Sequence, residues 1–240
     1  DRVNLYNNMI SLNGSAVASL VPSAIWVDSL SKYVNVYYNS GRLYAGANQA
    51  TTRTFSVQNS SQVQVLNNIF DNESKGYAAY VAIDTCVASF NYNDYWSNAE
   101  PNPNTGARKF VRWGAADVPY LDSLRILSGK DINSLELDPL FFGPRDLRLR
   151  IGILAERAQY NPDVTTDVYA NIRPQIPQPT IGCYEFNSVR VVHDVAVATI
   201  IDPFVPAVTS GANAVVNNIE TDSIMVRASF FNNGTSSLEE

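Results

Sequence analysis

The chain has 240 residues and a formal net charge of −6, from 23 acidic and 17 basic residues. This length is enough for one large hydrophobic core or two smaller ones. The lysines and arginines are scattered along the sequence, whereas binding to nucleic acid requires grouped positive charge. No stretch reaches the apolar length of a membrane span. We therefore expect neither a nucleic-acid partner nor a membrane-spanning protein.

The composition also bears on metals and disulfides. The sequence holds one histidine and two cysteines, with no Cys-x-x-Cys spacing, so a zinc site would lack ligands. The polar loop at Ser97–Gly106 lacks the grouped carboxylates that calcium requires, and we expect no metal or other cofactor. Cys86 and Cys183 either pair, if a later strand folds back onto the repeats, or remain two buried thiols, which is the simpler interpretation.

The first 96 residues contain a repeated pattern of two apolar residues at period two, followed by a turn that contains asparagine. The four copies are Arg2–Ile10, Tyr33–Gly41, Gln62–Phe70 and, less regularly, Cys86–Asp94. Their first valines lie 31, 29 and 24 residues apart. Period two predicts a strand, and the asparagine predicts a corner at its end. Repeats of this length indicate a solenoid, in which each turn buries its apolar face against the next.

A second alternating segment precedes each of the later copies. These segments are Ala24–Asp28, Thr54–Gln58 and Tyr80–Asp84, so each turn should contain at least two strands. The alternation predicts an inward-facing core made by Val3, Leu5, Ile25, Val27, Val34, Val36, Phe55, Val57, Val63, Val65, Val81, Ile83 and Val87. The intervening loops at Asn13–Ser23 and Arg42–Arg53 are either solvated connections or a binding surface.

The asparagines at the corners have a predicted structural role. In stacked turns, equivalent side chains lie about 4.8 Å apart, so their amides can form a hydrogen-bonded ladder. We expect this ladder to contain Asn8, Asn39 and Asn68, with Tyr92 in place of the fourth member.

Beyond the repeats the elements are less regular. Phe110–Trp113 is a short strand candidate, and Asp117–Leu127 has helical spacing, with Asp117 as its N-cap and Gly129 as its stop. We expect this helix to cover the last turn. Asp167 and Arg173 are predicted to form a structural ion pair in a closing loop, and Ile181–Phe186 is predicted to be the last strand of the domain.

Several short motifs follow the repeats in a definite order. They are Asn91–Trp96, Asp131–Ser134, Asp138–Phe141, Asp146–Leu149, Asp167 with Arg173–Pro174, and Ile181–Glu185. Together with the repeats, this order resembles right-handed parallel β-helix proteins, the superfamily of pectate lyases and many bacterial surface proteins. In those proteins the closing stretch ends in an IGAYE-like strand, whereas here Cys183 replaces the alanine and Asn171 stands near an expected glycine. The resemblance implies an all-β fold with one short capping helix in residues 1–186.

The remainder is predicted to be a separate, partial domain. Residues 187–193 are a linker, and residues 194–240 contain alternating segments at Asp194–Pro203 and Ser223–Phe231, with a turn at Asn232–Thr235. These resemble the opening strands of an immunoglobulin-like sandwich of the cell-adhesion-related bacterial type, which needs about 100 residues. Because an uncapped solenoid end exposes strand edges, we also expect further turns before Asp1 in a longer chain.

These features predict a function without naming a reaction. We expect a non-catalytic structural or adhesive module of a large secreted or cell-surface bacterial protein, which binds polysaccharide or a partner protein along the coil. The alternative, implied by the resemblance, is a polysaccharide lyase or hydrolase whose active site lies in more N-terminal turns. Within this sequence, Asp28 and Asp84 lie two predicted turns apart and His193 lies in the linker, so neither paired carboxylates nor a triad forms. We assign no catalytic residue and no binding residue.

Overall fold

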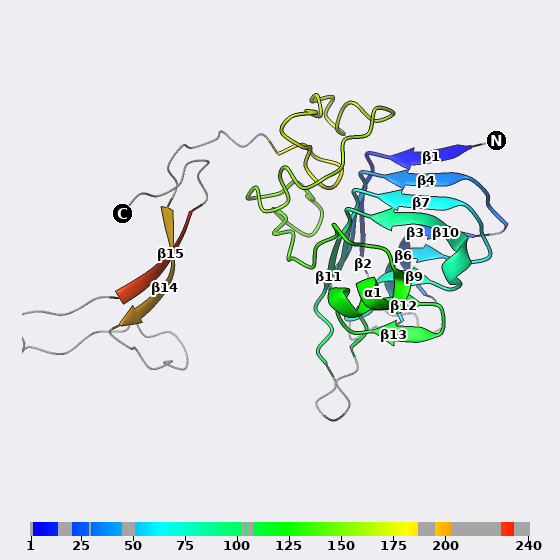
Figure 1. The fold of residues 1–240 in the computed structure, drawn as a ribbon, viewed down its shortest axis with the longest axis horizontal. Helices are drawn as coiled ribbons and strands as arrows, with labels where there is room; N and C mark the ends of the chain where they lie inside the picture. The colour runs from blue at the N-terminus through cyan, green and yellow to red at the C-terminus, as the bar shows by residue number, and fades with distance from the viewer. Residues whose placement is uncertain are drawn as a thin grey trace, which may run out of the picture. The chain divides into compact units, whose positions relative to one another are not determined.

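The computed structural model describes residues 2–13, 21–28, 30–44, 51–101, 104, 108–186, 195–202 and 227–232 (Figure 1). The chain divides into two compact units, Asp1–Asn187 and Ser188–Glu240. Parts of the loops predicted at Asn13–Ser23 and Arg42–Arg53 and of the polar loop at Ser97–Gly106 lie outside the described residues, as does the whole linker.

The first unit is a β-solenoid of about three turns, built from three parallel sheets (Figure 1). The first sheet contains β1 (Val3–Tyr6), β4 (Val34–Tyr37), β7 (Val63–Leu66) and β10 (Val87–Asn91). The second contains β2 (Met9–Asn13), β5 (Ser40–Tyr44), β8 (Ile69–Asn72) and β11 (Asp94–Ser97). The third contains β3 (Ser23–Val27), β6 (Arg53–Val57), β9 (Tyr77–Val81) and β12 (Val111–Trp113), with β13 (Ala116–Val118) antiparallel at one edge.

The register of the first sheet follows the sequence repeat. Val3 pairs with Val34, Val36 with Val65, and Val63 with Val87. The predicted strands that precede the repeats form the third sheet, where Phe55 aligns with Ile25 and Ala79. The solenoid and its parallel strands are therefore confirmed. Each turn contains three strands, because the polar segments after each corner form the second sheet.

The interior contains most of the predicted core. Ten of these side chains are buried, namely Ile25, Val27, Val34, Val36, Phe55, Val57, Val63, Val65, Val81 and Val87. Val3 is 56% exposed because β1 is the first strand of its sheet, and Leu5 is partly buried there. Ile83 is 48% exposed because β9 ends at Val81 and a 3₁₀ turn at Asp84–Cys86 follows. The prediction that Ile83 faces inward is wrong.

The fourth repeat departs from the valine alignment. The register shifts between Val87 and Ser89, so Phe90 pairs with Val65 and is buried. Such a β-bulge adds one residue to the strand. Inside the coil, Phe90 packs within a group of aromatic rings whose centroids lie 5.0–6.1 Å apart. The group contains Phe55, Phe70, Phe90, Tyr95, Phe110 and Trp113.

A helix, α1 (Leu121–Ser128), covers the β12 end of the coil. Its buried residues Leu121 and Leu124 join the coil core, and Gly129 ends it with a left-handed backbone angle, φ = 64°. The helix begins later than predicted, because Asp117 lies in β13. The Leu121 amide at its N-terminus donates to Glu136 Oε2 over 2.9 Å, so a carboxylate from the following segment replaces the predicted cap.

Residues 131–186, which we call the closing segment, lie alongside the coil (Figure 1). Leu135 forms a parallel bridge to Asp94 of β11, and Gly182 donates to the carbonyl of Asn67. A second hydrophobic core forms beneath this segment. Its buried members are Tyr37, Tyr38, Ile69, Phe141, Leu147, Leu149, Leu154, Ala158, Val164 and Ile181. The prediction of a final strand at Ile181–Phe186 is wrong, because this stretch has no regular strand.

The second unit contains two described strands. β14 (Val195–Asp202) pairs antiparallel with β15 (Arg227–Asn232). Both overlap the alternating segments predicted from the sequence.

Candidate binding site beside the first sheet

The corner after the first sheet is built by two consecutive residues in every turn. The first of each pair has a left-handed backbone, with φ of 55° at Asn7, 51° at Tyr38, 63° at Asn67 and 54° at Tyr92. The residue that follows it is an asparagine at all four corners. Asparagine amides can bond to neighbouring backbone groups and to each other, which suits a stacked corner.

These second residues form a hydrogen-bonded ladder. Asn8 Nδ2 donates to Asn39 Oδ1 over 2.8 Å, and Asn39 Nδ2 donates to Asn68 Oδ1 over 2.9 Å. Asn68 Nδ2 donates to Asn93 Oδ1 over 3.0 Å. The fourth member is therefore Asn93, and the expected position of Tyr92 in the ladder is wrong because the β-bulge in β10 shifts the corner by one residue.

The ladder ends in a buried acid. The backbone N–H of Asn93 donates to Ser134 Oγ over 2.9 Å, and Ser134 Oγ donates to Asp131 Oδ1 over 2.5 Å. Tyr95 also donates its hydroxyl to Asp131 Oδ1, over 2.9 Å. Burial raises the pKa of Asp131 to about 7, although these hydrogen bonds act in the opposite direction. Protonation of this carboxyl therefore falls in the neutral range.

Arg173 has a different partner from the one predicted. Its Nη1 lies 3.1 Å from Glu185 Oε2, and its guanidinium carbon lies 3.9 Å from the ring centroid of Tyr38. Asp167 instead accepts hydrogen bonds from the backbone amides of Tyr169, Asn171 and Glu185. The pairing of Asp167 with Arg173 is thus replaced by an Arg173–Glu185 ion pair, since the turn at Asp167 uses its carboxylate to bind backbone N–H groups.

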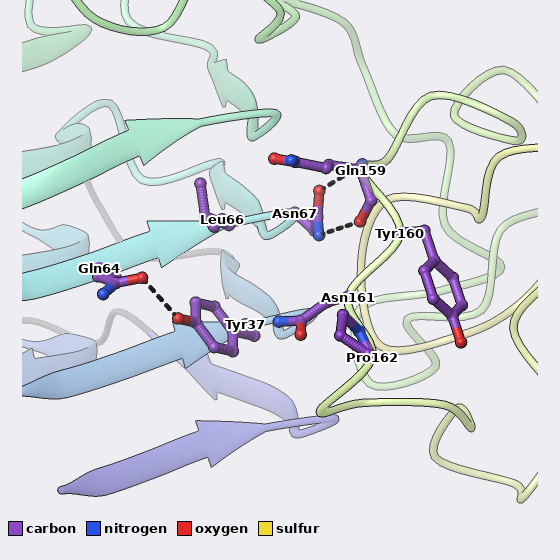
Figure 2. A pocket seen from close by; sticks show the side chains of 8 residues that line it. All are labelled: Tyr37, Gln64, Leu66, Asn67, Gln159, Tyr160, Asn161 and Pro162. Carbon is purple, nitrogen blue, oxygen red and sulfur yellow. Dashed lines mark hydrogen bonds between the residues drawn. The ribbon is translucent and has the colours of Figure 1, made fainter. Parts of the chain in front are cut away.

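Arg173 also ties the closing segment to the coil. Its Nη2 donates to Asn7 Oδ1 over 3.0 Å and to the Gly182 carbonyl over 2.8 Å. Beside this contact, Asn67 makes two reciprocal hydrogen bonds with the backbone of Gln159, each of 2.8 Å (Figure 2). The corner residues therefore position the loop at residues 159–162 against the first sheet.

A pocket of about 230 Å³ lies where this loop meets β4 and β7 (Figure 2). It is lined by Tyr37, Gln64, Leu66, Asn67, Gln159, Tyr160, Asn161 and Pro162. Figure 2 shows Asn161 on the strand side of the loop, towards Tyr37, and Tyr160 on its far side. The lining supplies amides, phenols and one apolar contact from the sheet, and it contains no carboxylate, histidine or cysteine.

The polar groups of this pocket are only partly engaged. The Tyr37 hydroxyl donates to Gln64 Oε1 over 2.8 Å, and Asn161 Oδ1 accepts from the amide of Asp163. Among the described residues, Gln64 Nε2 and Asn161 Nδ2 donate no hydrogen bond. Burial, followed by the charge of Asp163, raises the pKa of Tyr37, so its hydroxyl stays protonated at neutral pH. These groups can bind the hydroxyls of a ligand.

The outer face of the first sheet extends this chemistry away from the pocket. Asn4, Asn35 and Gln64 occupy equivalent positions on β1, β4 and β7, and Asn35 Nδ2 donates to Asn4 Oδ1 over 2.8 Å. A parallel row contains Tyr6 and Tyr37, of which Tyr6 is 47% exposed. The row of amides therefore runs across three strands beside the pocket, whereas the second row holds tyrosines on β1 and β4 and Leu66 on β7. Asn35 and Tyr37, in the middle of these rows, are only 4% and 6% exposed.

A second, larger pocket of about 400 Å³ lies between α1 and residues 134–137. Its charged groups already bind one another or the backbone. Arg125 donates to the carbonyls of Asp131 and Ser134, and Glu136 accepts from Arg108 and from the amide of Leu121. This pocket offers a ligand fewer free polar groups than the one beside the first sheet.

The other sequence-based expectations concern cysteines, metals and membranes. Cys86 and Cys183 are both free and buried, one in the coil core and the other beside Ser40 under the closing segment. Among the described residues, no group of three or more His, Cys, Asp or Glu side chains is placed to hold a metal ion. No helix in the part of the chain that the structure describes is long and apolar enough to cross a membrane.

Comparison with protein-family models, curated proteins and solved structures finds no match for this chain. The function is therefore inferred from the chemistry of the site itself.

Sequence reasoning did not find this pocket. Its residues come from two strands, one corner and a loop almost 100 positions further on. The visible signal was the outward position of Tyr37 and Gln64 in the repeats, because inward valines place the intervening residues outside.

Proposed function

We propose that this protein is a structural or adhesive module that binds neutral polysaccharide along the first sheet of its coil. The observation that carries the proposal is the pocket of tyrosines and side-chain amides beside the sheet, with the amide nitrogens of Gln64 and Asn161 available. Amides satisfy sugar hydroxyls as donors and acceptors, and aromatic side chains combine an apolar face with a polar tip.

The row of amides and the row of tyrosines favour an elongated ligand. The amides continue from the pocket across β7, β4 and β1, and the tyrosines across β4 and β1. A linear polymer can therefore contact Gln64 at the pocket and the exposed Asn4 and Tyr6 on β1. Several weak contacts on one chain combine through effective concentration, which gives useful affinity without a deep pocket. A rigid coil also suits a spacer or adhesive module, because its sheets hold these positions at a fixed separation.

The proposal includes a cellular setting and a finer description of the fold. We infer a right-handed β-helix, since parallel strands in one sheet are almost always joined by right-handed connections. We also infer that residues 194–240 begin an immunoglobulin-like domain, and that the module belongs to a longer secreted or cell-surface bacterial protein. The support is the sequence resemblance, together with the antiparallel pairing of β14 and β15.

The test is binding of the intact chain to an array of neutral oligosaccharides, followed by calorimetric titration with the tightest binder. Gln64→Met keeps the length of the side chain and removes its amide, and Asn161→Ala removes the second free donor. Each lost hydrogen bond should weaken binding by about three- to tenfold. The matched control is Gln175→Met, which changes an exposed glutamine of the closing segment.

Binding that is equally strong in all three variants would place the site elsewhere. An array on which no neutral glycan binds would refute the proposal. Loss of binding in both pocket variants but not in the control, with unchanged melting temperatures, would support it.

A further inference from the structure

The outer face of the third sheet has a composition unlike that of the first sheet. Trp26 on β3, Ser56 on β6, Tyr80 on β9 and Arg112 on β12 occupy one column of paired positions, which continues to Asp117 on β13. Trp26 is 60% exposed, although tryptophan usually buries most of its surface. An exposed indole on a regular sheet offers a flat apolar face to a ligand.

Arg53 lies over this column. Its guanidinium carbon lies 3.4 Å from the centroid of the Tyr80 ring, and its Nη1 donates to Ser56 Oγ over 3.4 Å. Ser56 is the residue paired with Trp26. The stacking on Tyr80 and the bond to Ser56 hold the guanidinium in the column, next to the strand that carries the exposed indole.

Arg53 forms no ion pair within the described residues, in contrast to Arg42, Arg108, Arg112, Arg125, Arg148 and Arg173. Its Nε is buried without a hydrogen-bond acceptor. Burial lowers the pKa of Arg53, as expected for a cation that is partly removed from water with no carboxylate beside it. The guanidinium therefore retains donors for an incoming anion.

The surrounding charges favour an anion on this face. Arg112 pairs with Asp117 over 2.8 Å, and Tyr77 donates its hydroxyl to the same carboxylate. Lys109 Nζ lies 5.8 Å from the centroid of the Tyr77 ring. Among its described residues the face carries three cations, Arg53, Arg112 and Lys109. It also carries the carboxylates of Asp117 and of Asp28, which lies two residues after Trp26 and accepts a hydrogen bond from Gln58.

We propose that this face binds an anionic saccharide, with a sugar ring stacked on Trp26 and a carboxylate, sulfate or phosphate group bound by Arg53. The planar guanidinium fork matches such groups through two parallel hydrogen bonds. A neutral sugar would use the indole but leave the guanidinium unpaired, so the anionic form should bind more tightly. This site is separate from the pocket beside the first sheet, and it does not depend on the function proposed above.

The experiment is calorimetric titration of the intact chain with four probes at low and moderate salt. The probes are oligogalacturonate, dextran sulfate oligomers, unmodified dextran oligomers and a poly-glutamate peptide. We expect binding of at least one anionic saccharide, weaker binding at higher salt, and at least tenfold weaker binding of unmodified dextran. The first two probes distinguish a carboxylate from a sulfate ligand.

Two variants test the residues. Trp26→Ala should weaken binding of the anionic saccharide by about tenfold. Arg53→Gln should weaken this binding by roughly ten- to a hundredfold and remove its dependence on salt. Arg53→Lys keeps the positive charge but lacks the planar guanidinium group, so it should bind the anionic saccharide more tightly than Arg53→Gln and less tightly than the parent chain. Arg148→Gln, which changes an exposed arginine of the closing segment, is the control and should bind like the parent chain.

Three results would overturn the proposal: no binding of either anionic saccharide, an equal affinity for unmodified dextran that persists in Gln64→Met, or preferential binding of poly-glutamate. Because Trp26 is largely exposed, its variant should fold even if a change at Arg53 disturbs β6. Unchanged affinity in Trp26→Ala would therefore also refute it. Loss of neutral-glycan binding in the Gln64 variant bears on the other site alone.

Discussion

The coil and the closing segment are stabilised in different ways. In the coil, equivalent apolar residues stack from turn to turn, so that Val36 meets Val65 and Phe55 meets Ile25. In the closing segment, the backbone is irregular and single polar contacts fix it, such as Arg173 with Glu185 and Asn67 with Gln159. A repeated core distributes stability over many similar contacts, whereas the closing segment combines a separate apolar core with a few polar contacts that are not repeated.

This difference predicts the largest effect in the centre of the coil. Val65→Asp places a carboxylate where the side chain is fully buried, and a buried charge without a partner costs several kcal/mol. The whole stability of a domain is about 5–15 kcal/mol. We expect loss of the cooperative thermal transition, measured by circular dichroism. A normal melt would show that the inward assignment of Val65 is wrong.

The next effect should be confined to the closing segment. Arg173→Met removes a buried cation, so the Gly182 carbonyl loses its donor and Glu185 loses its ion-pair partner. The buried Glu185 carboxylate then keeps only its hydrogen bonds from Thr180. Breaking a buried pair by removing one partner costs roughly 3–5 kcal/mol. We expect residues 131–186 to become sensitive to limited proteolysis while the coil keeps its strand signal.

The control for this prediction is Arg148→Met, which breaks an ion pair near the surface. Exposed pairs contribute little, so its cleavage pattern should match that of the parent chain. If Arg173→Met unfolds the coil together with the closing segment, the two regions form one cooperative unit and the comparison above fails.

The junction of the two regions should respond to pH through Asp131. Its pKa of about 7 in the folded chain exceeds the ordinary value of 3.8, so the folded state retains a proton that the unfolded state releases. Its contribution is therefore fully present below about pH 4, is lost as the pH rises towards 7, and is constant above that. Over three pH units the loss is about 4 kcal/mol.

Asp131→Asn should remove this part of the pH dependence. Asparagine accepts the left-handed backbone at this position, where φ is 59°. Denaturant melts from pH 4 to 8 should give a shallower slope than the parent chain, with a remaining slope of the same sign from Asp71 and Asp94, whose pKa values burial also raises. Asp122→Asn, in an exposed position on α1, should leave the profile unchanged. An unaltered slope in the Asp131 variant would show that this carboxyl is ionised in the folded chain.

The comparison also explains how much the sequence reveals. The first and third sheets could be predicted, because valines such as Val34 and Val63 alternate with outward residues. The second sheet was missed, because the closing segment covers its outer face and its strands bury polar residues such as Asp71 and Asp94. Two faces buried by different partners give no period-two signal.

The candidate sites show the same limit. The ladder at Asn39 and Asn68 follows from stacking alone, whereas Asn93 required knowledge of a bulge that shifts the register. The sequence paired Arg173 with Asp167, but the turn at Asp167 uses its carboxylate for backbone hydrogen bonds, and Arg173 pairs with Glu185. The pocket depends on how the loop at 159–162 packs against the first sheet. The sequence of that loop has no helical or strand periodicity from which its position could be predicted.

The smallest expected effect concerns the ladder and separates its interior from its end. Asn39 is fully buried, and its side chain bonds to both neighbouring asparagines and to the carbonyls of Leu5 and Tyr37. Asn39→Ala leaves several of these groups without a partner and should cost about 2–3 kcal/mol. Asn8 is only partly buried and has one ladder neighbour, so Asn8→Ala should cost about 1 kcal/mol, because water reaches the groups it leaves. Chemical denaturation of both variants measures the difference. Equal losses would mean that the ladder contributes through each corner separately, whereas a larger loss at Asn39 shows that stacking between turns makes an interior amide harder to replace.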